Sequence, residues 1–429
     1  MAPIALNAGP MLEVRLGTPP GRAEHRVRER FKNMHINRLK LENFKGFDHF
    51  EMELNDRFTL IIGRNGVGKS SILDALSVSF GSFLLGIPDA TSRHILKEEV
   101  REVVREFDGR MDFVSAYPAV VAAQGKVFAG SHDQVITASW KRELLKATGK
   151  TTIKDAREIR DLADSAYGII ASGGDATLPL LSYYGTGRLW VEPKRIDRKA
   201  RPSRFDAYRN SHEPRVSSYD LLEWLKRMRL NEFESDRPSG ILKAWRAAIE
   251  SCFDGPVRVN YSPSRGRIEV EFESASKVIA YDNLSHGQRN ILSMVGDIAY
   301  KAIILNPHLG SEAVSAARGV ILIDEIDLHL HPSWQKKIIP ALLKAFPRMQ
   351  FVATTHSPFV IQSLSEGVLF DLDDRHPDGD VYNMPLDDIV EAVQKVKVVD
   401  RAEPYIEQLE MSEGYLKLLN KIIDTSDPA

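Results

Sequence analysis

The run Gly63-Arg-Asn-Gly-Val-Gly-Lys-Ser70 has the residue types and the spacing of a loop that cradles phosphate groups. Its glycines allow the backbone to curl, so that successive N–H groups point at phosphate oxygens. Lys69 is expected to reach the β- and γ-phosphates, and the Ser70 hydroxyl is expected to coordinate Mg²⁺. The pattern therefore predicts a nucleoside triphosphate site. The residues expected to form it are Gly63, Arg64, Asn65, Gly66, Gly68, Lys69, Ser70 and Ser71.

Two adjacent carboxylates follow a second apolar run, Val320-Ile-Leu-Ile-Asp-Glu325. Such a run is typical of a central parallel strand that is buried on both faces. Ligands of open α/β sheets collect at the carboxyl ends of the strands, where these two acids are expected to lie. We expect Asp324 to hold Mg²⁺ together with Ser70, and Glu325 to polarise the attacking water.

A third segment, Leu284-Ser-His-Gly-Gln288, precedes the helical pattern 289–305. Ser285 is expected to cap that helix, and Gly287 leaves room for an anion to approach its free N–H groups. A fourth segment, Phe351-Val-Ala-Thr-Thr-His-Ser-Pro358, reads as a short apolar strand that ends near His356 and is stopped by proline.

The elements that must position these side chains follow from the flanking sequence. The apolar residues 58–62 predict a buried strand before the phosphate loop, and the residues from Ser71 onward have helical periodicity. The start of that helix would add the positive end of its dipole to the phosphate site. The order strand, loop, helix is the setting that a phosphate loop requires.

In this order the four segments resemble the ABC-type ATPase head of the RecF/SMC/OLD group. Segment 36–47 resembles the first strand of those heads. Segments 183–190, 323–335 and 347–358 also resemble the stand-alone bacterial ATPases of the AAA_15/AAA_21 type, which include PtuA of the Septu anti-phage system and retron-associated ATPases. The resemblance covers about residues 34 to 370 and is loose between 90 and 180. It implies an α/β fold: a RecA-like, mostly parallel sheet and an antiparallel β lobe, with a compact, mainly helical insertion.

For such heads the resemblance implies a head-to-head dimer, or a larger even-numbered assembly, with ATP and Mg²⁺ sandwiched at the interface. Ser285, Gly287 and Gln288 of one chain would cap the γ-phosphate held by Lys69 of the other. Asp327 would lie in the loop that crosses between the two sites. His356 would sense the γ-phosphate, and Lys45 would approach the nucleotide.

Two positions depart from the family pattern or leave it incomplete. His286 stands where the signature motif usually has glycine, a position that varies in SMC-like and RecF-like heads. The glutamine that usually contacts Mg²⁺ has two candidates, Gln124 and Gln134, and the sequence does not decide between them.

Composition limits the class of protein. The 429 residues carry a net charge of −2, so any contact with nucleic acid must be a local patch. The single cysteine, Cys252, excludes a disulfide within the chain and suits a reducing cytoplasm. No apolar run approaches the roughly 20 residues that span a bilayer, and the N-terminus lacks the apolar core of a signal peptide. We therefore expect a cytoplasmic protein with no membrane contact.

Three local elements are predicted. A helix is expected near 95–107 within the insertion, a β-hairpin over 257–272, and an exposed acidic turn at Asp371, Asp373 and Asp374.

The chain as a whole is expected to have five parts. These are residues 1–33, a disordered tail or an early start codon; 34–90, the lobe with the phosphate loop; 91–255, the insertion; 256–370, the rest of the ATPase core; and 371–429, a helical extension.

The function predicted from these residues is ATP hydrolysis that gates a separate effector, an HNH-type nuclease, in anti-phage defence. The biological role depends on the resemblance alone. A RecF-like DNA-repair ATPase is the first alternative, because the basic run 194–204 with Phe205 and Tyr208 could bind a phosphate backbone, although a solvated loop explains it equally well. The second alternative is a scaffold that holds ATP without turnover.

Overall fold

The fold is built on a sheet of six described strands in the order β15-β14-β3-β13-β12-β8. The pairs from β14 to β8 are all parallel, and only β15 runs antiparallel to its neighbour. Strands β3, β13, β12 and β8 are buried at every residue, as continuous apolar runs predict. The bounds are β15 (His376–Asp378), β14 (Val368–Asp371), β3 (Phe58–Ile62), β13 (Met349–Thr354), β12 (Gly319–Ile323) and β8 (Leu180–Tyr184).

This is a computed structural model, and it describes residues 34–88, 90–107, 110–128, 130, 135–188, 203–209, 211–212, 218–253, 255–273, 277–374, 376–378 and 384–394. The predicted tail 1–33, Gln134, most of the basic run 194–204 and most of the C-terminal extension lie outside these residues.

A second, antiparallel sheet forms the β lobe, in the order β2-β1-β6-β7. Helix α2 (Lys69–Leu84) contacts strands of both sheets, and most of its residues are buried because it has sheet on two sides. The indole Nε1 of Trp140 on β7 donates to the Ser79 carbonyl of α2 at 3.0 Å, which joins the lobe to the helix. The strands are β1 (His35–Phe44), β2 (Phe47–Glu53), β6 (Ala119–Phe128) and β7 (Val135–Leu144).

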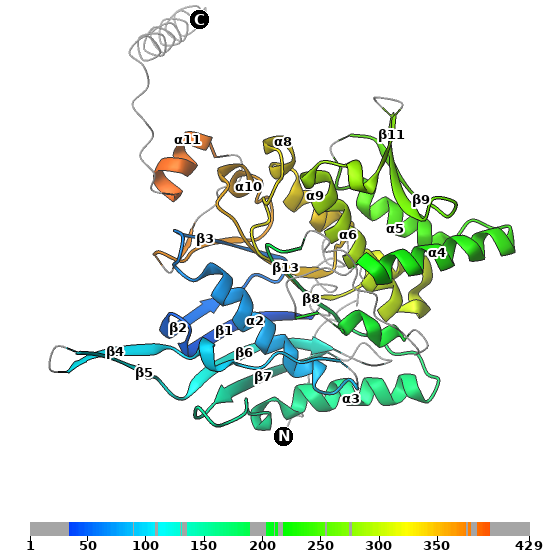
Figure 1. Ribbon diagram of the computed structural model, residues 1–429. Coiled ribbons are helices and arrows are strands. Elements are labelled where there is room, and N and C mark those ends of the chain that lie inside the picture. The colour runs from blue at the N-terminus through cyan, green and yellow to red at the C-terminus, as the bar shows by residue number, and fades with distance from the viewer. Residues whose placement is uncertain are drawn as a thin grey trace, which may run out of the picture.

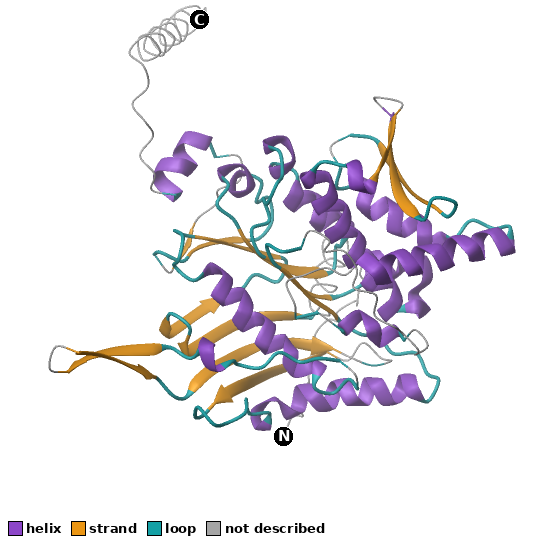
Figure 2. Ribbon diagram, in the orientation of Figure 1, coloured by secondary structure: helices purple, strands orange, loops and turns teal. Residues whose placement is uncertain are grey.

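Helix α6 is buried along most of its length and packs against α4, α5, α7 and β8 (Figures 1 and 2). A three-stranded sheet, β9 (Val257–Ser262), β10 (Arg267–Phe272) and β11 (Lys277–Ala280), lies beside them and contains the predicted hairpin. The helices are α3 (Arg157–Ala171), α4 (Ser218–Ser235), α5 (Gly240–Glu250), α6 (His286–Leu305), α7 (Ala313–Ala316), α8 (Pro332–Gln335), α9 (Ile338–Ala345), α10 (Pro358–Gln362) and α11 (Leu386–Asp388).

The prediction of a helix over 95–107 was wrong. Residues Glu102–Phe107 form β4, which pairs with β5 (Arg110–Ser115) in a ribbon that projects from the body of the molecule (Figure 2). Apolar and charged residues recur here at a spacing that suits a helix, but Val103 and Val104 are β-branched and pair across the ribbon with Val114 and Phe113. Segment 91–255 therefore supplies strands as well as helices, and β6, β7 and β8 belong to the two main sheets.

Among the described residues, no helix has both the length and the apolar character needed to cross a membrane.

Candidate active site

Strands β3, β12, β13 and β8 are parallel neighbours, so their carboxyl ends meet at one edge of the sheet. The phosphate loop follows β3, the two acids follow β12, and His356 comes two residues after the end of β13. Three of the predicted segments therefore converge because of the topology alone.

The phosphate loop has the backbone that its glycines were predicted to allow. The φ angles are +140° at Gly63, +82° at Gly66 and +109° at Gly68. Gly68 has a second constraint, since a Cβ there would lie 2.7 Å from the Phe47 ring. The Lys69 ammonium lies inside the loop and donates to the carbonyls of Gly63 and Arg64 at 2.8 and 2.9 Å.

Ser70 and Asp324, the two predicted Mg²⁺ ligands, are in direct contact. The Ser70 hydroxyl donates to Asp324 Oδ2 at 2.8 Å, and the Thr354 hydroxyl donates to Oδ1 at 2.6 Å. The donor set is a hydroxyl and a carboxylate, both hard oxygen ligands, and Mg²⁺ commonly uses one or two such groups together with substrate phosphates. The residues present therefore fit Mg²⁺. Within the described part of the chain, no cluster of three or more His, Cys, Asp or Glu side chains could hold a metal by itself.

Glu325 is held by its own backbone. Its φ of +46° lies in the left-handed region that non-glycine residues seldom adopt. Its N–H donates to Thr354 Oγ1 at 2.8 Å, and its carbonyl accepts from Arg188 Nη2 at 2.6 Å and from the Leu328 N–H at 2.9 Å. These bonds hold both backbone groups and fix the direction in which the Glu325 carboxylate leaves the strand end.

The charges of the site influence one another. Burial lowers the pKa of Lys69, while Asp324, Asp373 and Glu325 oppose that shift. Burial, and then the charge of Lys69, lower the pKa of His356, so its imidazole is neutral at pH 7. A neutral imidazole can still form a hydrogen bond to a phosphate group. It also avoids a second positive charge beside Lys69.

The signature segment forms the predicted cap of α6. Gln288 N donates to Ser285 Oγ at 3.2 Å and Ser285 N donates to Gln288 Oε1 at 3.0 Å, which completes a capping box. The structure gives Gly287 a different reason from the predicted one: a Cβ there would meet the His329 carbonyl oxygen at 2.5 Å. The first turn of α6 therefore rests on the loop 327–331. In that loop the Asp327 carboxylate accepts from the Thr355 hydroxyl.

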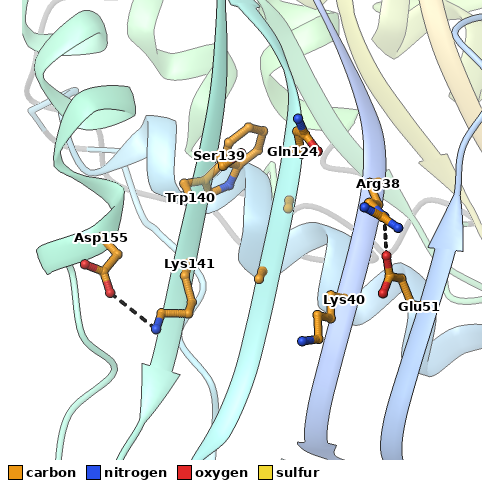
Figure 3. Close-up of a pocket in the computed structure, with 10 residues that line it drawn as sticks. Arg38, Lys40, Glu51, Gln124, Ser139, Trp140, Lys141 and Asp155 are labelled. Atoms are coloured by element: carbon orange, nitrogen blue, oxygen red, sulfur yellow. Dashed lines mark ion pairs between the residues drawn. The ribbon is translucent and has the colours of Figure 1, made fainter.

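The remaining predicted residues have varied surroundings. Lys45 forms ion pairs with Asp74 of α2 and with Glu99, so its ammonium is engaged within the chain. Asn65 is exposed and Ser71 is half-buried in the first turn of α2. Gln124 lies on β6 beside Ser139 and Arg38, on the face of the antiparallel sheet drawn in Figure 3. Gln134 is outside the described residues.

Three residues of the site had not been expected there from the sequence. Arg188 is fully buried and bonds to the backbone at Asp324 and Glu325, and Thr354 bonds to both acids. Asp373 was expected in an exposed turn, but it accepts from the backbone N of Arg64 at 2.7 Å and from Arg64 Nε at 3.1 Å. Asp371 in the same turn is buried, and only Asp374 is exposed as predicted.

A signal for the first of these was present in the sequence. Arg188 falls in segment 183–190, which carried part of the family resemblance. Thr354 falls in segment 347–358, which carried another part of the resemblance, whereas the contact of Asp373 depends on strand order and had no such signal.

Family models match most of this architecture. The model described as an AAA domain, AAA_23, matches residues 38–252, about half of the chain. A second AAA-domain model, AAA_21, whose description refers to the AbiEii toxin of type IV toxin–antitoxin systems, matches residues 275–362. The chain belongs to the AAA-domain family.

Relatives of this chain include a retron protein and a Septu protein. The protein named "Retron Ec83 probable ATPase" of Escherichia coli is 26% identical over 379 residues, which cover 76% of this chain and 69% of the relative. The Septu protein PtuA of Bacillus mycoides is 26% identical over 353 residues, which cover 78% of this chain and 40% of that protein. Among solved structures, the SMC head domain of Thermotoga maritima aligns with 79% of this chain and 94% of its own, at 18% identity and a TM-score of 0.41.

The geometry described above brings these groups together at one edge of the sheet. The Lys69 ammonium lies in the phosphate loop, and the Ser70 hydroxyl bonds to Asp324 at the end of β12. The Glu325 carboxylate is at the neighbouring position, where bonds to its backbone hold it.

Proposed function

We propose that this chain is a Mg²⁺-dependent ATPase that dimerises around two molecules of ATP and so gates a separate effector, an HNH-type nuclease, in bacterial anti-phage defence. The observation that carries the catalytic part is the direct bond between Ser70 and Asp324. It places the phosphate loop and the carboxyl end of β12 close enough for Ser70 and Asp324 to bind the same cation.

Each residue then has a role. The loop N–H groups and Lys69 bind the β- and γ-phosphates, and His356 contacts the γ-phosphate as a neutral ring. Glu325 orients the attacking water and accepts its proton. When bound, Mg²⁺ neutralises the charge that develops between the β- and γ-phosphates.

Dimerisation is supported by the state of the signature segment. Ser285 and His286 are exposed, and the first turn of α6 presents N–H groups with the positive end of its dipole. In the proposed dimer these groups cap the γ-phosphate held by the partner subunit, so neither chain has a complete site alone.

The role in defence is supported by the names of the relatives, a retron ATPase and the Septu protein PtuA. An effector in a separate polypeptide is proposed by analogy with that group, as is action in the cytoplasm.

The catalytic proposal is tested by phosphate release from purified full-length chain with ATP, with and without Mg²⁺, beside Glu325→Gln. Light scattering should find a dimer of Glu325→Gln with Mg-ATP and no such dimer without nucleotide. A parent chain that releases no phosphate above Glu325→Gln would support a scaffold instead.

The biological proposal needs a separate experiment. An HNH nuclease gene beside this one, co-expressed with it, should restrict phage growth, and Lys69→Met should abolish that protection. Salt-dependent duplex DNA binding by the isolated chain would instead favour the RecF-like alternative, because phosphate contacts release counterions.

A further inference from the structure

Arg188 is a buried cation whose hydrogen bonds to other described residues all go to uncharged oxygens. Its side chain has no exposed surface. Nε donates to Asn290 Oδ1 at 2.7 Å, Nη1 to the carbonyls of Asp324 at 2.6 Å and Gly185 at 3.1 Å, and Nη2 to the Glu325 carbonyl at 2.6 Å. Taking a guanidinium out of water is costly unless its N–H groups are satisfied, and here four oxygen acceptors meet that need.

These bonds join two segments that serve different nucleotides in the proposed dimer. Asp324 and Glu325 act on the nucleotide of their own chain. Asn290 lies on α6, five residues after Ser285, so it belongs to the helix whose first turn faces the partner's nucleotide. Arg188 is the direct side-chain link between them.

Asn290 extends the link to the crossing loop. Its Nδ2 donates to the Leu328 carbonyl at 2.7 Å, while its Oδ1 accepts from Arg188. Gly287 rests on His329 of the same loop. A displacement of the start of α6 therefore carries both the loop 327–331 and Arg188 with it.

We propose that Arg188 is a positioning residue that couples the two nucleotide sites, by transmitting the position of α6 through Asn290 to the backbone of Glu325. This rests on the proposed ATP-sandwiched dimer. When α6 caps the partner's nucleotide, its position is passed through Asn290 to the arginine fork, which holds the Glu325 carbonyl. The carboxylate then points at the attacking water. Arg188 itself touches neither nucleotide nor water.

The chain offers a matched control for this link. Tyr184 also joins β8 to α6 by a buried side-chain bond, from its hydroxyl to Asp297 Oδ2 at 2.8 Å. Asp297 lies about two turns further along α6 than Asn290. Tyr184→Phe therefore removes a buried bond between β8 and the same helix, and it leaves the Arg188 fork intact.

The experiment compares Asn290→Ala, Asn290→Asp, Arg188→Lys and Tyr184→Phe in the full-length chain. We measure phosphate release against ATP concentration, the Hill coefficient, ATP affinity in the absence of turnover, and thermal unfolding. We expect the parent to hydrolyse ATP with a Hill coefficient above 1. Asn290→Ala should lower kcat about tenfold, a typical size for coupling between sites, and bring the Hill coefficient to 1 with unchanged ATP affinity.

The other variants refine the test. Asn290→Asp keeps an oxygen for Arg188 and loses the bond to Leu328, so it should retain more activity than Asn290→Ala. Arg188→Lys keeps the charge without the fork and should behave like Asn290→Ala. Tyr184→Phe should keep the parent's kcat and Hill coefficient, whatever its melting temperature.

The outcomes separate this proposal from the one on which it rests. If Tyr184→Phe loses cooperativity as Asn290→Ala does, or if Asn290→Ala keeps the parent's Hill coefficient, the coupling role is overturned while the ATPase stands. A Hill coefficient of 1 in the parent overturns the coupling role in the same way. A parent without turnover, or a Glu325→Gln variant that never dimerises on ATP, overturns both. Should Arg188→Lys fail to fold, the Asn290 pair still decides.

Discussion

The two halves of the proposed nucleotide site are held in different ways. In the phosphate-loop half, Lys69 and Asp324 are 8% and 7% exposed, and Ser70 and Thr354 bond directly to the acid. In the signature half, Ser285 is exposed, and its capping bonds go only to Gln288 within its own turn.

The sheet therefore brings the phosphate-loop half together, and we call it the assembled half. The signature half is an exposed helix start on the surface of the chain. Parallel strands bring their ends together whether or not a ligand is present. A capped helix start on the surface keeps its N–H groups oriented, and in the proposed dimer the γ-phosphate held by the partner subunit binds them. Variants in the two halves should therefore fail in different ways.

The largest effect is expected in the assembled half, from Glu325→Gln. The amide keeps the size of the side chain but cannot accept the proton of the attacking water, so hydrolysis should fall by about 10³-fold. ATP affinity should stay within a few-fold of the parent. Rapid-quench phosphate release and equilibrium nucleotide binding measure the two quantities. Parental turnover in this variant would remove Glu325 from the chemistry.

Lys69→Met should fail at binding. The variant loses charge-assisted hydrogen bonds to phosphate, worth about 1.5–3 kcal/mol, and so should bind ATP roughly 10- to 100-fold more weakly. Isothermal titration calorimetry with a non-hydrolysable ATP analogue and Mg²⁺ measures this loss of affinity. Arg64→Met is a control in the same loop, because the Arg64 side chain is largely exposed and bonded to Asp373. Equal losses in both variants would contradict the special position of Lys69.

Ser285→Asp separates the halves most directly. Aspartate is as good a helix cap as serine, so the melting temperature should not fall. Its charge would repel the partner's γ-phosphate, and hydrolysis should drop about tenfold or more while ATP binding by the single chain is retained. Sedimentation with Mg-ATP should find fewer dimers. If binding by the isolated chain weakened instead, the signature segment would belong to the assembled half.

The smallest effect concerns pH. The pKa of His356 is lowered below about 6.5, its ordinary value, so the ring is neutral in the folded chain above that pH. Since the unfolded chain takes up this proton at a higher pH than the folded chain, stability is full above about 6.5 and decreases as the pH falls toward the lowered pKa. Activity should fall roughly twofold over the same window. His356→Gln should lack this acidic limb in its pH profile.

Much of the assembled half could be predicted from sequence, because its signals are local. A glycine-rich loop between a strand and a helix, and two acids after an apolar run, keep their meaning without knowledge of the fold. Arg188, Thr354 and Asp373 could not be assigned in that way. Their roles arise from the order β14-β3-β13-β12-β8, which brings distant strand ends together.

The prediction of a helix where the β4–β5 ribbon begins was wrong for a related reason. Over 95–107 the spacing of apolar residues fits a helix, and only pairing with β5 favours the strand. Cross-strand pairs such as Val104 with Phe113 lie outside any single window of sequence. The hairpin at 257–272 was predicted correctly, since its two alternating strands flank a turn rich in serine and glycine.

The close approach of Gly287 to the His329 carbonyl has a consequence for mutational tolerance. At position 286 a bulky imidazole is accommodated, since it is exposed and lies 5.5 Å from the His329 ring. At position 287 even a methyl group would clash with the His329 carbonyl oxygen, which belongs to the main chain. A library randomised at both codons should therefore return many side chains at the first and glycine almost alone at the second.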